Sequence, residues 1–298
     1  MKILVIQTRP GIGDVCLFLP PIHEIAVHNQ KFQIDLLTKK RTSAKDTLAY
    51  DPYIKNIFYL EDYNYSNIQL LKFIKSNHYD KAYIFHYGVR YPVLCKISGV
   101  KKTFSYGILK KKENIVEKSR RSCSEWLNKK DLKFPYKIYR PNIARSSNNI
   151  IIGIGGSEPS KKWQTQNFIK LINKIKLIKK CNFLLAGGEQ EQEVATKLIM
   201  ALPDVKITSL CNKKIDEAIN LIEGAKLYIG NDTGFMHLCA GLGISSYGLF
   251  GDTPTNYADY TKKIRVITPP GIDIIGRGSL AMSKISADHV FEQIKQSI

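Results

Sequence analysis

The chain has 298 residues, of which 44% are hydrophobic and 24% charged, and it carries a formal net charge of +19. This composition is that of an ordinary globular protein, and the length suits two domains of about 150 residues each. No apolar run approaches the roughly 18 residues of a membrane-spanning helix, which excludes an integral helical membrane protein.

The distribution of charged residues and cysteines indicates the kind of partner and the cellular compartment of the protein. Residues 1–150 carry 27 Lys and Arg against 12 Asp and Glu, whereas residues 151–298 carry 18 against 14. This asymmetry predicts that the first half faces something anionic: a phosphorylated substrate, an anionic membrane surface or nucleic acid. Six cysteines are scattered without a CxxC pair or a metal-ligand spacing, which predicts free thiols in a cytoplasmic protein.

In the first half, short apolar runs alternate with longer amphipathic ones. The apolar runs predict strands at residues 2–7, 32–38, 56–60 and 81–86. Helices are predicted to begin near Asp14, Asn67 and Tyr91. This alternation indicates a parallel sheet with helices on both faces. The polar Pro/Ser/Asn-rich stretch at 141–149 is predicted to link two domains, 1–145 and 146–298.

The same alternation restarts after the linker. Apolar runs predict strands beginning at Ile150, Cys181, Ala225 and Ile244. Amphipathic patterns predict helices at 165–180, 189–202 and 286–298, the last with Ser286 as its N-cap. The expected architecture is therefore two Rossmann-like α/β units in tandem, with the ligand in a cleft between them at the carboxyl ends of the strands.

The first loop, "TRPGIGD", is glycine-rich but lacks the marks of a phosphate loop. The third glycine of a dinucleotide fingerprint is replaced by Cys16, and no G-K-[ST] sequence is present. Asp14 stands at the predicted helix start, where a carboxylate would repel phosphate. Two interpretations stay open at this point: Asp14 caps the helix, or it acts as a general base beside a substrate admitted by Gly11 and Gly13.

Two further loops carry chemistry-bearing residues. In "GIGGSEPSKKWQ", glycines, the hydroxyls of Ser157 and Ser160 and the ammonium of Lys161 could cradle a diphosphate, although a plain loop with solvated lysines fits equally well. In "GNDTGFMH", the backbone N–H groups of Thr233 and Gly234 would point out of a helix start toward a phosphate. A lone His237 on such a helix is more often a packed core histidine than a catalyst.

The "DTGFMH" turn, the small-residue helix after it and the "LFGDT" strand end strongly resemble glycosyltransferase family 9, the ADP-heptose:lipopolysaccharide heptosyltransferases. The resemblance extends to Gly13-Asp14, to "KKW" at 161–163 and to "AGGEQEQE". It implies a GT-B fold, in which two Rossmann-like domains face each other across a cleft. The first loop is longer than is usual in the family, and the ending after "LFGDT" differs, so the identity of both sugars stays open.

The resemblance also implies roles for individual residues. Asp14 matches the proposed catalytic base, on an acceptor-side loop that includes Arg9, Gly11 and Gly13. The expected donor-side residues are Ser157, from the cradle described above, together with the positions that match the family: Lys161, Glu189, Asp232, Thr233, Gly234 and His237. Among them, Lys161 and the 233–234 turn are expected to bind the diphosphate, Asp232 to lie near the donor sugar and Glu189 to meet the ribose. His237 has no assigned role.

The function implied is an inverting transferase that moves a heptose, or a related sugar, from a nucleotide-sugar to a lipopolysaccharide or lipooligosaccharide core. No metal or other cofactor is expected, since the chain has no Asp-x-Asp motif. The expected partners are the nucleotide-sugar, an anionic lipid-linked acceptor and the inner face of the cytoplasmic membrane, where the protein would be peripheral. The alternatives are a family member with another donor or without catalysis, and a nucleic-acid-binding protein, suggested by charge alone.

Overall fold

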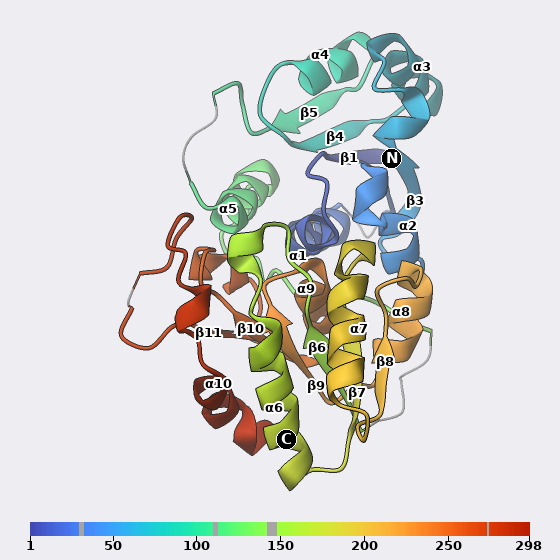
Figure 1. The fold of residues 1–298 in the computed structure, drawn as a ribbon. Coiled ribbons are helices and arrows are strands. Elements are labelled where there is room, and N and C mark those ends of the chain that lie inside the picture. The colour runs from blue at the N-terminus through green and yellow to red at the C-terminus, as the bar shows by residue number, and fades with distance from the viewer. Residues whose placement is uncertain (30–32, 110–112, 142–147, 273) are drawn as a thin grey trace. The chain divides into compact units, whose positions relative to one another are not determined.

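The computed structural model describes residues 1–29, 33–109, 113–141, 148–272 and 274–298. They form two compact units, Met1–Pro141 and Asn142–Ile298 (Figure 1). Residues 142–147 of the predicted linker lie outside the described residues.

The first unit is an α/β unit with a parallel sheet in the strand order β3-β2-β1-β4-β5. Its strands are β1 (Ile3–Gln7), β2 (Ile34–Thr38), β3 (Ile54–Tyr59), β4 (Lys81–Phe85) and β5 (Lys102–Ser105). Its helices are α1 (Ile12–His28), α2 (Ala44–Thr47), α3 (Asn67–Asn77), α4 (Arg90–Ile97) and α5 (Ile115–Leu127). Strand β1 is buried along its whole length, as expected for a strand covered on both faces.

The second unit repeats this topology. Its parallel sheet has the order β11-β10-β9-β6-β7-β8. The strands are β6 (Asn149–Gly153), β7 (Asn182–Ala186), β8 (Ile207–Ser209), β9 (Leu227–Asn231), β10 (Ser245–Leu249) and β11 (Ile264–Ile267). The helices are α6 (Thr165–Ile178), α7 (Gln192–Ala201), α8 (Ile215–Ile222), α9 (Gly234–Gly241) and α10 (Ala287–Ile294). Both sheets follow the Rossmann order, in which the first strand of each unit is central.

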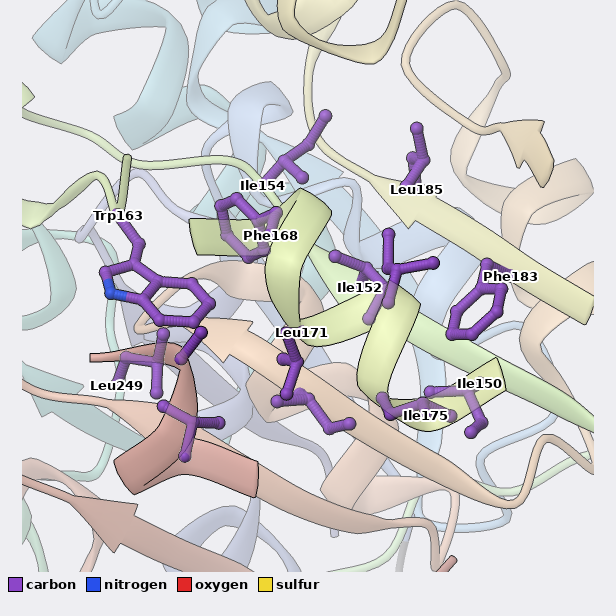
Figure 2. Packing of buried hydrophobic residues seen from close by; sticks show 14 of the residues in the cluster. Ile150, Ile152, Ile154, Trp163, Phe168, Leu171, Ile175, Phe183, Leu185 and Leu249 are labelled. Atoms are coloured by element: carbon purple, nitrogen blue, oxygen red, sulfur yellow. The ribbon is translucent and has the colours of Figure 1, made fainter. Parts of the chain in front are cut away.

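Helix α6 packs on one face of the second sheet, together with α7 and α10. Figure 2 shows Phe168, Leu171 and Ile175 of this helix against Ile152 of β6 and neighbouring strand side chains. The helical residues recur three or four positions apart, so a single apolar stripe faces the sheet. This core fixes the strands whose carboxyl ends carry the polar loops discussed below.

The predicted N-cap of the last helix is confirmed. Ser286 precedes α10, and its Oγ accepts a hydrogen bond of 3.1 Å from the His289 N–H. We expect Ser286→Ala to lower the free energy of unfolding by about 1 kcal/mol, because one N–H at the helix start loses its acceptor. Chemical denaturation of both proteins would measure this loss. An unchanged midpoint and slope would contradict it.

Two elements of the first unit, β5 and α5, were not predicted from the sequence; they lie within residues 101–150, which carry 14 Lys and Arg against four Asp and Glu. Helix α5 is amphipathic: Val116, Ser119 and Cys123 are buried while most of its charged side chains face outward. Its N-cap is Asn114, whose Oδ1 accepts from the Val116 N–H at 2.7 Å. The many lysines and arginines of this segment make its amphipathic helical pattern hard to recognise in the sequence.

Candidate functional site

The second sheet has its topological switch point between β6 and β9, because the chain continues from these neighbours in opposite directions across the sheet. In parallel α/β sheets, ligands bind outside the carboxyl ends of the strands at such a point. The loop 154–164 follows β6 and the turn 232–233 follows β9. Two of the three loops singled out in the sequence therefore meet at the edge where a ligand is expected.

Asn231 joins these two loops. Its side chain is fully buried, donates to the Gly155 carbonyl at 2.8 Å and accepts from the Trp163 N–H at 3.0 Å. Its own carbonyl accepts from the Tyr228 hydroxyl at 2.8 Å. A Cβ at Gly153 would lie 1.8 Å from that hydroxyl, so only glycine fits there. The loop and the turn are thus held together by side chains that do not reach the surface.

The two adjacent lysines of the loop after β6 have different surroundings. The Lys162 ammonium lies 2.7 Å from Oε1 of Glu191, which is buried and whose Oε2 accepts from the Gly188 N–H at 2.9 Å. Within the described parts of the chain, no carboxylate oxygen lies within 4.0 Å of the Lys161 ammonium. Lys162 is therefore committed to the loop after β7, whereas Lys161 is available to an anionic ligand.

Asp232 and His237 lie together at the start of α9. The His237 Nε2 is 3.4 Å from Oδ1 of Asp232, and its Nδ1 is 2.6 Å from the Tyr260 hydroxyl. Burial raises the pKa of Asp232, but the adjoining His237 ring and the Lys161 ammonium outweigh this, and the pKa is held below its usual range. Asp232 is thus an ionised carboxylate at neutral pH, oriented by a buried histidine.

The start of α9 also offers hydrogen-bond donors. Thr233 is the N-cap, and its carbonyl accepts from the N–H groups of Met236 and His237. The first N–H groups of a helix have no acceptor within it, and the helix dipole adds positive potential there. The backbone of Gly234, with no side chain over it, is therefore suited to contact an anion such as a phosphate.

A second carboxylate near Lys161 was not predicted. Asp252 follows β10 in "LFGDT", is buried and accepts from the Leu280 N–H at 3.1 Å. A hydrogen bond from the Ser160 side chain, then this N–H and the charge of Lys161, lower its pKa. In the sequence this residue was noted only as part of the "LFGDT" strand end. Asp252 therefore contacts both Ser160 of the loop after β6 and the backbone at Leu280.

The remaining predicted donor-side residues lie on the same edge but differ in exposure. Ser157 and Glu189 are both exposed, on the loops that follow β6 and β7 respectively. In the same "GGEQE" stretch, Glu191 rather than Glu189 accepts a hydrogen bond from Lys162. No observation tests the roles expected of Ser157 and Glu189, and they stay predictions.

The first unit has its own switch point, between β1 and β4. Across it, the Thr8 hydroxyl oxygen lies 2.7 Å from Nδ1 of His86, which follows β4. Burial, then the charges of Arg90 and Lys39, lower the pKa of His86, so its ring is neutral at pH 7. A role for this histidine was not predicted, because nothing around it in the sequence forms a motif.

Asp14 lies at this switch point, in the first turn of α1. Its Oδ2 accepts from the Gly11 N–H at 2.9 Å, and its Oδ1 lies 2.5 Å from Nε of Arg9. A Cβ at Gly11 would lie 3.0 Å from the same carboxylate. Asp14 therefore caps the start of α1 through the Gly11 N–H, in agreement with the capping interpretation. Each carboxylate oxygen has two lone pairs, so capacity to accept a substrate proton is left.

Neither a metal-binding cluster nor a membrane-spanning helix is present in the described residues. They contain no group of three or more His, Cys, Asp or Glu side chains that could hold a metal ion. They also contain no helix that is both long enough and apolar enough to span a bilayer.

Solved structures of similar fold define the class. Over the whole chain, a structure of E. coli ADP-heptose lps heptosyltransferase II matches at a TM-score of 0.81 with 18% identity, covering 98% of that chain. E. coli heptosyltransferase WaaC with ADP-2-deoxy-2-fluoro heptose matches at 0.77 with 16% identity, and both chains are fully covered. The fold is GT-B, built from two Rossmann-like units.

The chain belongs to glycosyltransferase family 9 (heptosyltransferase), whose model matches residues 106–269. The match includes every predicted donor-side residue but not Asp14. Lipooligosaccharide heptosyltransferase 2 of Campylobacter jejuni is 33% identical over 132 residues. That alignment spans 42% of this chain and 41% of the relative.

Proposed function

We propose that the protein is an inverting glycosyltransferase that moves a heptose from ADP-heptose to the core of a lipopolysaccharide or lipooligosaccharide. Family membership and the names of the relatives support this activity. The observation that carries it is the position of Lys161, Asp232 and the start of α9 at one switch point, within the residues that match the family. There a cation and helix N–H groups are available to a diphosphate.

On the donor side, Lys161 and the N–H groups at Thr233 and Gly234 would bind the diphosphate. The ionised Asp232, oriented by His237, would accept hydrogen bonds from hydroxyls of the donor sugar. Ser157 would add a hydroxyl to the diphosphate contacts, and Glu189 would meet the ribose. In this arrangement Lys161 and the helix start stabilise the negative charge that develops on the leaving diphosphate, so the reaction needs no metal.

On the acceptor side, Asp14 would act as general base on a loop shaped by Gly11 and Gly13. It takes the proton from an acceptor hydroxyl while that oxygen forms a bond to the anomeric carbon of the heptose. The bond from this carbon to the diphosphate oxygen breaks on the opposite face, so the configuration inverts and ADP leaves. Arg9, paired with Asp14, would hold the carboxylate in position.

The acceptor would be an anionic, lipid-linked oligosaccharide. The excess of basic residues in the first half supports an anionic partner there. The protein would then work in the cytoplasm, as a peripheral protein at the inner face of the cytoplasmic membrane.

Nucleotide binding provides a direct test. We expect ADP at 100 times its Kd to raise the free energy of unfolding by about 2.7 kcal/mol, because it binds only the folded protein. A thermal-shift panel of nucleoside diphosphates would show this and identify the base. Release of nucleoside diphosphate from a panel of nucleotide-sugars would then identify the sugar. Stabilisation by no nucleoside diphosphate, together with tight binding of duplex DNA, would overturn the proposal.

A further inference from the structure

The outer side of α4 exposes apolar side chains that the first unit does not cover. On its inner side the helix contributes Tyr91, Leu94 and Cys95 to the core. Val89, Val93 and Ile97, each one helical turn from the next, are between 47% and 63% exposed. Because residues four apart lie on one face of a helix, these three form a continuous apolar stripe.

Two contacts place further segments with exposed apolar residues beside α4. The Gly88 N–H donates to the Gly107 carbonyl at 2.9 Å, which places the segment after β5 beside the start of α4. Arg90 donates to the Asn67 side chain at 2.8 Å, and α3 and α4 lie side by side (Figure 1). The exposed apolar residues of these neighbouring segments, together called the α4 surface below, are Ile68, Val89, Val93, Ile97, Ile108 and Leu109.

The chain segment that forms the α4 surface is strongly basic. Residues 64–109 contain seven Lys and Arg, and their only acidic residue is Asp80. Its carboxylate already lies 2.6 Å from the Lys101 ammonium. Lys72, Lys96 and Lys102 are exposed on α3, α4 and β5. The α4 surface is therefore an apolar patch on a segment with an excess of positive charge.

We propose that the α4 surface docks the protein on an anionic lipid bilayer. Apolar side chains of a surface helix enter the boundary between headgroups and acyl chains, while flanking lysines bind lipid phosphates. A second copy of the chain fits less well, since two identical basic surfaces repel each other. Nucleic acid would leave Val93 and Ile97 without a role, because phosphates gain nothing from aliphatic contacts. Docking would bring the first unit to the proposed lipid-linked acceptor, but it does not depend on sugar transfer.

Vesicle binding tests the proposal with the full chain. We expect co-sedimentation with phosphatidylcholine vesicles that contain one third phosphatidylglycerol, and much weaker binding to pure phosphatidylcholine or at high salt. Val93→Ser with Ile97→Ser should lower the partition coefficient about tenfold or more. Lys96→Gln with Lys102→Gln should lower it by about fivefold for each lysine.

The matched control replaces exposed apolar residues of the second unit. Leu177→Ser with Met200→Ser, on α6 and α7, should leave vesicle binding unchanged. The proposal is overturned if the natural protein does not co-sediment with the anionic vesicles, or if the Val93/Ile97 variant binds them as tightly as the natural protein does. It is equally overturned if that variant abolishes self-association or duplex binding instead. Stabilisation by ADP, measured on the same variants, should not change, so this result stands apart from the proposed transferase activity.

Discussion

Asp14→Asn is expected to lower the rate of sugar transfer by about 100-fold or more while ADP binds as before. The amide oxygen of asparagine can still accept the hydrogen bond from Gly11, so the start of α1 is retained. The amide cannot, however, take a proton from the acceptor hydroxyl. Steady-state kinetics with a purified acceptor would measure the rate, and calorimetry would measure ADP binding.

The control is Asp288→Asn, which changes an exposed first-turn carboxylate of α10 in the second unit that pairs with Lys174. We expect its turnover to match that of the natural protein. If Asp14→Asn also turns over normally, Asp14 is only a residue of the helix start. If Asp14→Asn loses activity only because part of the protein is unfolded at the assay temperature, that result would point the same way.

Lys161→Ala should weaken ADP binding about 10-fold to 100-fold. A hydrogen bond to a charged group contributes about 1.5–3 kcal/mol, and each 1.4 kcal/mol is a factor of ten in Kd. Calorimetric titration with ADP would give the change, and urea denaturation should show little loss of stability, since no described carboxylate is paired with this lysine.

The adjacent lysine is the natural comparison. Lys162→Ala removes the partner of the buried Glu191 carboxylate, so we expect the free energy of unfolding to fall by about 1–3 kcal/mol. This is less than for a fully buried pair, because the Lys162 side chain is 34% exposed. ADP affinity should fall less than in Lys161→Ala. The opposite pattern, with Lys162 dominating affinity and Lys161 stability, would reassign the diphosphate contact.

Most of the strands could be predicted because buried parallel strands are continuous apolar runs. Ile150, Ile151 and Ile152 of β6 and Leu227 and Ile229 of β9 are of this kind. Helix α5 was missed since its apolar positions are few and separated by lysines and arginines. The order of the strands, and so the switch points, came only with the structure, because backbone pairing between distant segments leaves no local mark.

The candidate site was predicted in its motifs but not in its contacts. Lys161, Asp232 and Thr233 were found because they sit in recognisable loops. Glu191 and Asp252 were not found, because their importance depends on the residues that they contact only after the chain has folded. Glu191 meets a lysine 29 residues away, and Asp252 meets the backbone of Leu280, 28 residues away.

The buried side chain of Asn231 has a consequence for how ligands are selected. It fixes the loop after β6 to the turn after β9 before any ligand arrives, so little conformational entropy is lost when an anion binds between them. The loop backbone is thus preorganised, and its shape does not depend on the identity of the donor. In the proposed function, discrimination among sugars would then be left to side chains such as Asp232, and exchange of those side chains would alter the preferred sugar while the loops keep their conformation.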